Sequence, residues 1–231
     1  MVTASTVKQS KVVLLDFDGT LAATHLAVIE CVNRTSAKLG YGPVERDKVS
    51  MAIAGGLSLP ETFTTVIRGL TPHQVSICVG VYRELYAEVD AECSHLFKGV
   101  YTTIQEIHAA GVRLAVLSNK GPVAIAEALQ RFRLAPFVAC VLGAEAGQPT
   151  KPDPTLFHAR VAPVFPHVPR TAFLMVGDTT ADIRFAKAVG IQSCWASYGY
   201  GDPMACRQLA PEYEIGCFTQ LLSILTSANQ R

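Results

Sequence analysis

The feature that most constrains this chain is the segment from Lys11 to Thr20, KVVLLDFDGT, in which a short apolar run ends in two acids. The four residues VVLL have the length and composition of a buried β-strand. Asp16 and Asp18 follow, one residue apart, and Gly19 comes directly after them. Two unit charges about 4 Å apart repel by roughly 4 kcal/mol at an effective dielectric of 20. A strand that ends in two carboxylates therefore requires a compensating charge, and a divalent cation is the simplest one.

The composition indicates a large hydrophobic core and argues against two classes of partner. Of 231 residues, 49% are hydrophobic and 17% are charged, so we expect one medium domain or a core with a smaller partner domain. A formal net charge of +1 gives no electrostatic footprint for nucleic acid or for an anionic membrane. The longest apolar runs have strand length, well below the roughly 18 residues that a spanning helix needs. We expect neither a nucleic-acid partner nor a membrane.

The N-terminal segment and the cysteines predict a cytoplasmic protein. Only four apolar residues occur in a row before Asp16, which is too short for the hydrophobic core of a signal peptide. The seven cysteines are scattered singly, without a CxxC pair. This usage is typical of reduced thiols and not of a disulfide framework.

Periodicity along the chain predicts a parallel α/β sheet with a helical insertion. The segments with helical periodicity before residue 97 are 24–39, 45–53, 59–69 and 72–90. From Lys98 onward, strands alternate with helices, which predicts a doubly wound parallel (Rossmann-like) sheet with both faces covered. We expect a catalytic α/β core, residues 1–21 and 97–231, and a small α-helical cap, residues 22–96. The cap should lie over the carboxyl ends of the strands, where ligands of such sheets bind.

Polar side chains follow two further predicted strands. Ser118 and Asn119 come after the strand at 113–117, and Asp178 comes after the strand at 173–176, with Asp182 four residues on. Lys151 lies in a rigid loop, TKPDP. Taken singly, each has a simpler explanation as a cap residue or a solvated loop residue. Taken together, they supply acids, one cation and hydrogen-bond donors suited to one reaction.

These segments resemble, in order and character, the four motifs of the haloacid dehalogenase superfamily of phosphohydrolases. The matching segments are DFDGT, Ser118-Asn119, Lys151-Pro152 and GDTTAD at 177–182. Four further segments are similar to the phosphoglycolate phosphatase branch: GVxxxIxxIxxxG at 99–111, SNK at 118–120, the YxxxY of VYRELYAE, and GYG at 199–201.

The resemblance implies a Mg²⁺-dependent phosphatase that works through an aspartyl-phosphate. Asp16 would attack phosphorus, and Asp18 would protonate the leaving alcohol and later deprotonate water. The metal ligands would be Asp16, the backbone carbonyl of Asp18, and Asp178, with Asp182 supporting the metal indirectly. The phosphate-binding residues would be Gly19, Thr20, Ser118, Asn119 and Lys151.

The resemblance places the other end of the substrate against the cap. The segment AGGLSLPETF (54–63) is similar to the family's substrate-contacting loop, and its glycine N–H groups would reach an anionic substrate group. The candidate substrate-contacting residues are Thr24, His25, Gly55, Gly56 and Arg68. Relatives usually continue the first motif with an Asp-Ser pair, whereas this chain has Ala22, Ala23 and Thr24. That Asp, which provides a hinge or a substrate contact in relatives, has no counterpart here, while Thr24 can replace the serine hydroxyl.

The expected activity is hydrolysis of a small phosphorylated metabolite, with phosphoglycolate as the first candidate. A small lid that closes over its site excludes bulk water and large substrates. A phosphomutase or pyrophosphatase on the same fold stays open, as does a non-enzymatic regulatory binding protein. Mutases that resemble beta-phosphoglucomutase carry a histidine ten residues after the second acid, where this chain has Val28. That difference counts against a mutase.

Overall fold

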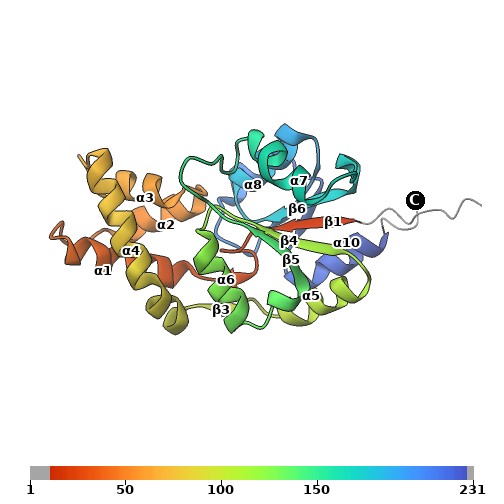
Figure 1. The fold of residues 1–231 in the computed structure, drawn as a ribbon, viewed down its shortest axis with the longest axis horizontal. Helices are drawn as coiled ribbons and strands as arrows, with labels where there is room; N and C mark the ends of the chain where they lie inside the picture. Colours follow the sequence, from red (N-terminus) through yellow and green to blue (C-terminus); the bar gives the residue numbers. More distant parts are fainter. Residues whose placement is uncertain (1–10, 228–231) are drawn as a thin grey trace, which may run out of the picture.

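The computed structural model describes residues 11–227 and shows a six-stranded parallel sheet with helices on both faces and a helical cap at one end (Figure 1). The sheet order is β5-β4-β1-β6-β7-β8. Its strands are β1 (Val12–Leu15), β4 (Arg113–Leu117), β5 (Val138–Leu142), β6 (Phe173–Gly177), β7 (Gln192–Ala196) and β8 (Tyr213–Ile215). This architecture confirms the predicted doubly wound fold. Most of the segment considered as a signal peptide lies outside the described residues.

The apolar run of β1 is fully buried because alternate side chains enter different hydrophobic clusters. Val13 and Leu15 belong to one cluster, and Val12 and Leu14 to another, as the period of two in a strand requires. The first cluster is covered by α5 (Val100–Ala109), α6 (Pro122–Arg131) and α10 (Leu221–Ser227). The second is covered by η2 (Phe157–Val161), α7 (Ala162–Val164) and α8 (Thr180–Val189). A strand packed on both faces has no room for polar residues until it ends.

The register of the three central strands brings their carboxyl ends to one level. Leu15 pairs with Val116 of β4 and with Val176 of β6. The residues that follow each strand therefore emerge side by side at the same edge of the sheet. This edge faces the cap in Figure 1.

The cap consists of four helices around an apolar cluster of their own. Its helices are α1 (His25–Lys38), α2 (Arg46–Ala54), α3 (Leu59–Val66) and α4 (Pro72–Cys93). Thr71 caps α4, because its hydroxyl accepts a hydrogen bond from the Gln74 N–H at 3.3 Å. Two short antiparallel strands, β2 (Ala22–Ala23) and β3 (His95–Leu96), carry the chain into and out of the cap. We propose cap boundaries at residues 22 and 96 because these strands pair at the point of entry and exit.

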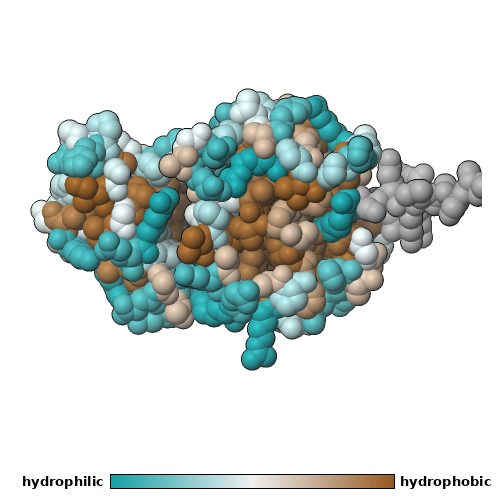
Figure 2. Space-filling model, in the orientation of Figure 1, coloured by the Kyte–Doolittle hydropathy of each residue, from teal (hydrophilic) through white to brown (hydrophobic). Residues whose placement is uncertain are grey.

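The cap rests on the core at Gly56, in the loop after α2. A Cβ atom at Gly56 would lie 2.8 Å from Thr179 Oγ1 and 3.0 Å from Ala181 Cβ, and its φ is +70°. The Asn119 side chain also donates a hydrogen bond to Gly56 O at 3.3 Å. Figure 2 shows cap and core as two lobes that touch across a narrower waist. The cap therefore lies docked over the carboxyl ends of the strands.

Short elements complete the core and differ most from the sequence prediction. Within the alternation of strands and helices predicted after Lys98, one helical segment is a turn of π-helix, η2, that continues into the short α7. Additional short elements are η1 (Ala135–Phe137), η3 (Arg170–Ala172), α9 (Pro203–Gln208) and η4 (Phe218–Gln220). Among the helices of residues 11–227, none combines the length and hydrophobicity of a membrane span.

Candidate active site

Three acids from two strand ends gather around one lysine at the carboxyl edge of the sheet. Asp16 follows β1, Asp178 follows β6, and Asp182 lies in the first turn of α8. Each of the three offers a carboxylate oxygen, and these oxygens lie within 4.8 Å of one another. Lys151 Nζ lies 3.0 Å from Asp16 Oδ1 and 2.5 Å from Asp182 Oδ1. The site thus holds three buried carboxylates and one buried ammonium.

The surroundings make two of these acids hard to ionise. Burial raises the pKa of Asp16 to about 6, although the Lys151 ammonium opposes the shift. Burial, followed by the nearby charges of Asp16 and Asp182, raises the pKa of Asp178 well above its usual range. Burial alone would lower the pKa of Lys151, but the two acids beside it outweigh that effect, so its pKa is raised and it stays charged. With all three acids ionised, the cluster would carry more negative charge than Lys151 neutralises.

The hydrogen bonds show which carboxylates could hold a cation. Asp182 is already occupied, because Oδ1 accepts from Lys151 and Oδ2 accepts from the N–H and the hydroxyl of Thr179 at 3.0 and 2.8 Å. Asp178 accepts only neutral donors, the Thr20 hydroxyl at 3.0 Å and the Tyr200 N–H at 2.8 Å. Asp16 and Asp178 are therefore suited to bind a divalent cation, while Asp182 orients Lys151.

Gly19 is required by the close approach of the first-motif turn to Asp178. Its φ is +76°, and a Cβ atom there would lie 2.2 Å from Asp178 Oδ2. Any larger residue would displace the Asp178 carboxylate. The turn after β1 and the end of β6 are thus fitted to each other at atomic contact.

The two residues of the second motif, Ser118 and Asn119, lie at the same edge of the sheet but contact different partners. The Ser118 hydroxyl accepts a hydrogen bond from the Lys120 N–H at 3.3 Å, and its proximity opposes the upward shift in the pKa of Asp16. The Asn119 amide instead holds the Lys151 loop, since it donates to Lys151 O at 2.9 Å and accepts from Lys151 N at 3.0 Å. In this arrangement Asn119 fixes the lysine and so acts on the site through it.

A haloacid dehalogenase-like hydrolase family model matches residues 13–196. The chain belongs to this family. The match spans β1 to β7 and includes the cap.

Curated relatives and solved structures agree with that membership. The phosphoglycolate phosphatase of Vibrio parahaemolyticus is 26% identical over 223 residues, which cover 93% of this chain and 96% of the relative. That of Vibrio cholerae is 28% identical over 206 residues, covering 86% and 90%. A predicted phosphoglycolate phosphatase from Haemophilus somnus superposes with a TM-score of 0.81 at 23% identity, covering 95% of this chain and 99% of that one. This chain of the haloacid dehalogenase-like family is a phosphatase, that is, a hydrolase of phosphoric monoesters.

The cap residues expected to contact substrate occupy different environments in this family member. Gly55 and Gly56 direct their N–H groups to Met51 O and Ile53 O, at 3.0 and 2.9 Å, so these donors are already used in closing α2. Arg68 is exposed in the turn after α3, and within residues 11–227 it makes no ion pair. The role of these residues in substrate contact stays a prediction.

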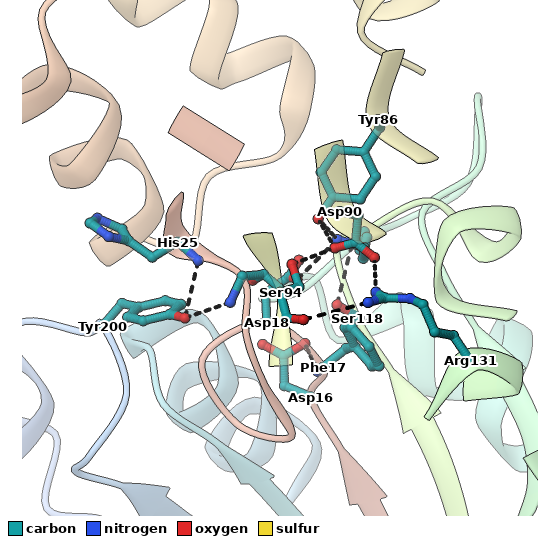
Figure 3. Close-up of polar contacts among 12 residues, drawn as sticks. Asp16, Phe17, Asp18, His25, Tyr86, Asp90, Ser94, Ser118, Arg131 and Tyr200 are labelled. Carbon is teal, nitrogen blue, oxygen red and sulfur yellow. Dashed lines mark hydrogen bonds and ion pairs between the residues drawn. The ribbon is translucent and has the colours of Figure 1, made fainter. Parts of the chain in front are cut away.

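The start of α1 is held by a core residue, Tyr200. The N–H groups of Thr24 and His25 donate to the Tyr200 hydroxyl at 2.7 and 3.1 Å. The His25 ring lies 5.2 Å from the Tyr200 ring, and its Nε2 lies 3.0 Å from Ser50 Oγ. In Figure 3 the His25 ring lies beyond Tyr200, away from Asp18. Tyr200 therefore accepts hydrogen bonds from the N-terminus of α1, where Thr24 provides no side-chain cap.

The sequence alone gave no site role to four residues that the structure places around Asp18 and at the start of α1. These residues are Tyr86, Asp90, Lys120 and Tyr200. Three of them occur in segments that resemble the phosphoglycolate phosphatase branch: YxxxY, SNK and GYG. Those segments were the available signal, but they carried no chemical role until their neighbours in space were known.

Proposed function

We propose that this phosphatase hydrolyses phosphoglycolate in a Mg²⁺-dependent reaction through a phosphorylated Asp16. The observation that carries the proposal is the buried Asp16 carboxylate, held beside Lys151 at the end of the central strand. The Phe17 N–H and the Lys151 ammonium both lie against Asp16 Oδ1, at 2.8 and 3.0 Å. These contacts fix the side chain in one orientation, as a positioned nucleophile requires.

In the first half-reaction an Asp16 oxygen forms a bond to phosphorus and the bond from phosphorus to the alcohol oxygen breaks. Asp18 donates its proton to the departing alkoxide. In the second, water attacks the phosphorus of the aspartyl-phosphate, Asp18 takes the proton of that water, and the Asp16 carboxylate leaves. Lys151 and Ser118 compensate charge on the phosphoryl oxygens in both steps. Thr20 and Gly19 shape the turn that faces the phosphate.

The donor set fits Mg²⁺, with Asp16, Asp178 and the backbone carbonyl of Asp18 as its ligands. Support comes from the excess negative charge of the cluster and from the raised pKa values of Asp16 and Asp178. When bound, Mg²⁺ would neutralise the repulsion between the nucleophilic carboxylate and a phosphate dianion.

The substrate assignment is supported by the relatives and by the docked cap. Both Vibrio relatives described above are phosphoglycolate phosphatases. The loop at Gly56 contacts the core directly, and a cap docked this closely favours a small substrate. We also propose a cytoplasmic location, because all seven cysteines are free thiols.

The test is release of inorganic phosphate from 2-phosphoglycolate by chelator-treated protein with and without added Mg²⁺. We expect activity only with the metal, and none for Asp16→Asn. The exposed residue Asp47 supplies a matched control, Asp47→Asn, which should keep full activity. Turnover by Asp16→Asn would exclude it as the nucleophile. Following sugar phosphates and pyrophosphate by phosphorus NMR separates a mutase or a pyrophosphatase from the proposed enzyme.

A further inference from the structure

Lys120, which follows the second motif, places its ammonium directly on the second acid of the first motif. Lys120 Nζ lies 3.0 Å from Asp18 Oδ1 and 2.5 Å from the Tyr86 hydroxyl. It also lies 4.0 Å from the centre of the Tyr86 ring, a cation–π distance. The Lys120 side chain is 8% exposed, whereas Asp18 is 27% exposed. Lys120 is thus a largely buried charge whose partners are one core acid and one cap tyrosine.

The Tyr86 hydroxyl connects Lys120 to a second ion pair, that between Asp90 and Arg131. It donates to Asp90 Oδ1 at 2.9 Å, and burial raises its pKa well above the usual range, so it stays protonated. Asp90 Oδ2 accepts from Arg131 Nη2 at 2.5 Å, and Oδ1 also accepts from Ser94 Oγ at 2.6 Å. Figure 3 shows the part of these contacts that joins Tyr86, Asp90 and Arg131.

The line of contacts crosses between cap and core twice. Tyr86 and Asp90 lie one turn apart on α4 of the cap, so they share one helix face. Lys120 precedes α6 of the core and Arg131 ends it. Movement of α4 away from the core would remove the Tyr86 hydroxyl from Lys120 and Asp90 from Arg131. The contact of Lys120 with Tyr86 therefore exists only while the cap is docked, whereas its contact with Asp18 lies within the core.

We propose that Lys120 is a positioning residue that aligns the Asp18 carboxylate, and that Tyr86, Asp90 and Arg131 hold it in place when the cap closes. The inference rests on the proposed acid–base role of Asp18. It gives cap closure a chemical consequence beyond exclusion of water, because the proton donor is aligned only in the closed state. An open enzyme would keep its nucleophile but lack an oriented acid.

The test compares two substrates that differ in how much they need a proton donor. An alkyl phosphate such as 2-phosphoglycolate loses a basic alkoxide, whereas p-nitrophenyl phosphate loses a stable phenolate. A residue that acts through Asp18 affects the first substrate more than the second. A residue that only maintains the fold affects both equally.

The informative variants are Tyr86→Phe, which removes one hydroxyl, and Lys120→Met, which removes the ammonium. Both should lower kcat for 2-phosphoglycolate by roughly fivefold or more relative to the effect on p-nitrophenyl phosphate, the rate equivalent of about one hydrogen bond. Asp18→Asn should show the same preference at roughly a hundredfold or more. Tyr82→Phe is the matched control, since Tyr82 stacks on Tyr86 one turn away. Within residues 11–227 its hydroxyl bonds neither Lys120 nor Asp90, so it should show no preference.

Three results would overturn the proposal. If Asp18→Asn shows the preference but the other two variants slow both substrates equally, Lys120 does not act through Asp18, and the proposed reaction stands without it. If Lys120→Met raises KM for 2-phosphoglycolate at unchanged kcat, the lysine binds the substrate instead. If Asp18→Asn shows no preference, the acid role in the proposed reaction fails, and this inference fails with it. Circular dichroism shows whether each variant is folded. If Tyr86→Phe does not fold, the substrate preference of Lys120→Met alone tests the proposal.

Discussion

Replacing Asp178 by Asn should stabilise the metal-free protein, although it removes a proposed metal ligand. The carboxylate is fully buried, and its bonding partners are the Thr20 hydroxyl and the Tyr200 N–H. An Asn oxygen can accept from the Tyr200 N–H, while its amide group donates to the Thr20 hydroxyl, which accepts equally well. The substitution therefore keeps the shape and both hydrogen-bond partners, and it removes a group that must either carry a buried charge or hold a proton that the unfolded chain releases.

The size of the effect follows from the spacing of the acid cluster. Carboxylate oxygens of Asp16, Asp178 and Asp182 lie within 4.8 Å of one another, and unit charges at that distance repel by roughly 3 kcal/mol at an effective dielectric of 20. Lys151 pairs with the other two acids and not with Asp178. We expect Asp178→Asn to raise the free energy of unfolding of the metal-free protein by about 3 kcal/mol at neutral pH.

The sign of the pH dependence is fixed by the raised pKa values. Above the ordinary carboxyl pKa of 3.8, the unfolded chain releases a proton that folded Asp178 keeps, so the free energy of unfolding falls as pH rises. Asp16, whose pKa is raised to about 6, contributes in the same direction between its ordinary pKa of 3.8 and about 6. The advantage of Asp178→Asn should thus be small near pH 4 and grow toward neutral pH.

Urea unfolding of chelator-treated protein at about pH 5 and about pH 8 measures this difference. Mg²⁺ at about 100 times its Kd should then stabilise the wild type by about 2.7 kcal/mol and leave the variant unchanged. The exposed Asp47→Asn should alter stability by less than about 1 kcal/mol at either pH. If Asp178→Asn destabilises the metal-free protein equally at both pH values, the excess charge inferred for the cluster is absent.

Two further substitutions test other parts of the site. Lys151→Met should destabilise the protein by about 3–5 kcal/mol in urea unfolding and abolish phosphate release, because it leaves the buried carboxylates of Asp16 and Asp182 without a cation. The exposed Lys98→Met is the control and should change neither stability nor phosphate release. Gly56→Ala should lower kcat/KM about tenfold, because its Cβ would lie 2.8 Å from Thr179 Oγ1 and push the cap away from the core. Gly69 has a similar φ but lies in open space, so Gly69→Ala should lower stability by about 1–2 kcal/mol and leave kcat/KM unchanged. Equal kinetic losses in both glycine variants would show that cap docking at Gly56 is unimportant for turnover.

The parts of this molecule that sequence predicts well are those set by local pattern and parallel topology. The run VVLL must be buried on both faces, so the acids behind it must emerge at the strand end. The same holds for β4 before Ser118 and for β6 before Asp178. Because parallel strands present their carboxyl ends together, separate segments could be assigned to one site before any contact was known.

The parts that escaped prediction depend on contacts between distant segments. Tyr86 and Asp90 look like ordinary residues of an amphipathic helix, and Lys120 like a solvated lysine, until α4 packs on α6. Asn119 follows Ser118 in sequence, yet its amide turns to the backbone of Lys151. β8, with three residues, is too short for a periodicity signal.

The pairing of β2 with β3 has a consequence for how the chain folds. Ala22 lies opposite Leu96 and Ala23 opposite His95, so a long insertion begins and ends at one point. As a disordered loop, such an insertion would cost the core roughly 4 kcal/mol of closure entropy before β1 could pair with β4. Within the cap, each helix packs against the next one along the chain, and α1 also packs against α4. Contacts between segments that are close in sequence can form early in folding. Once α1 and α4 have packed, they keep the core segments before and after the cap close together. The folded cap therefore speeds the pairing of β1 with β4.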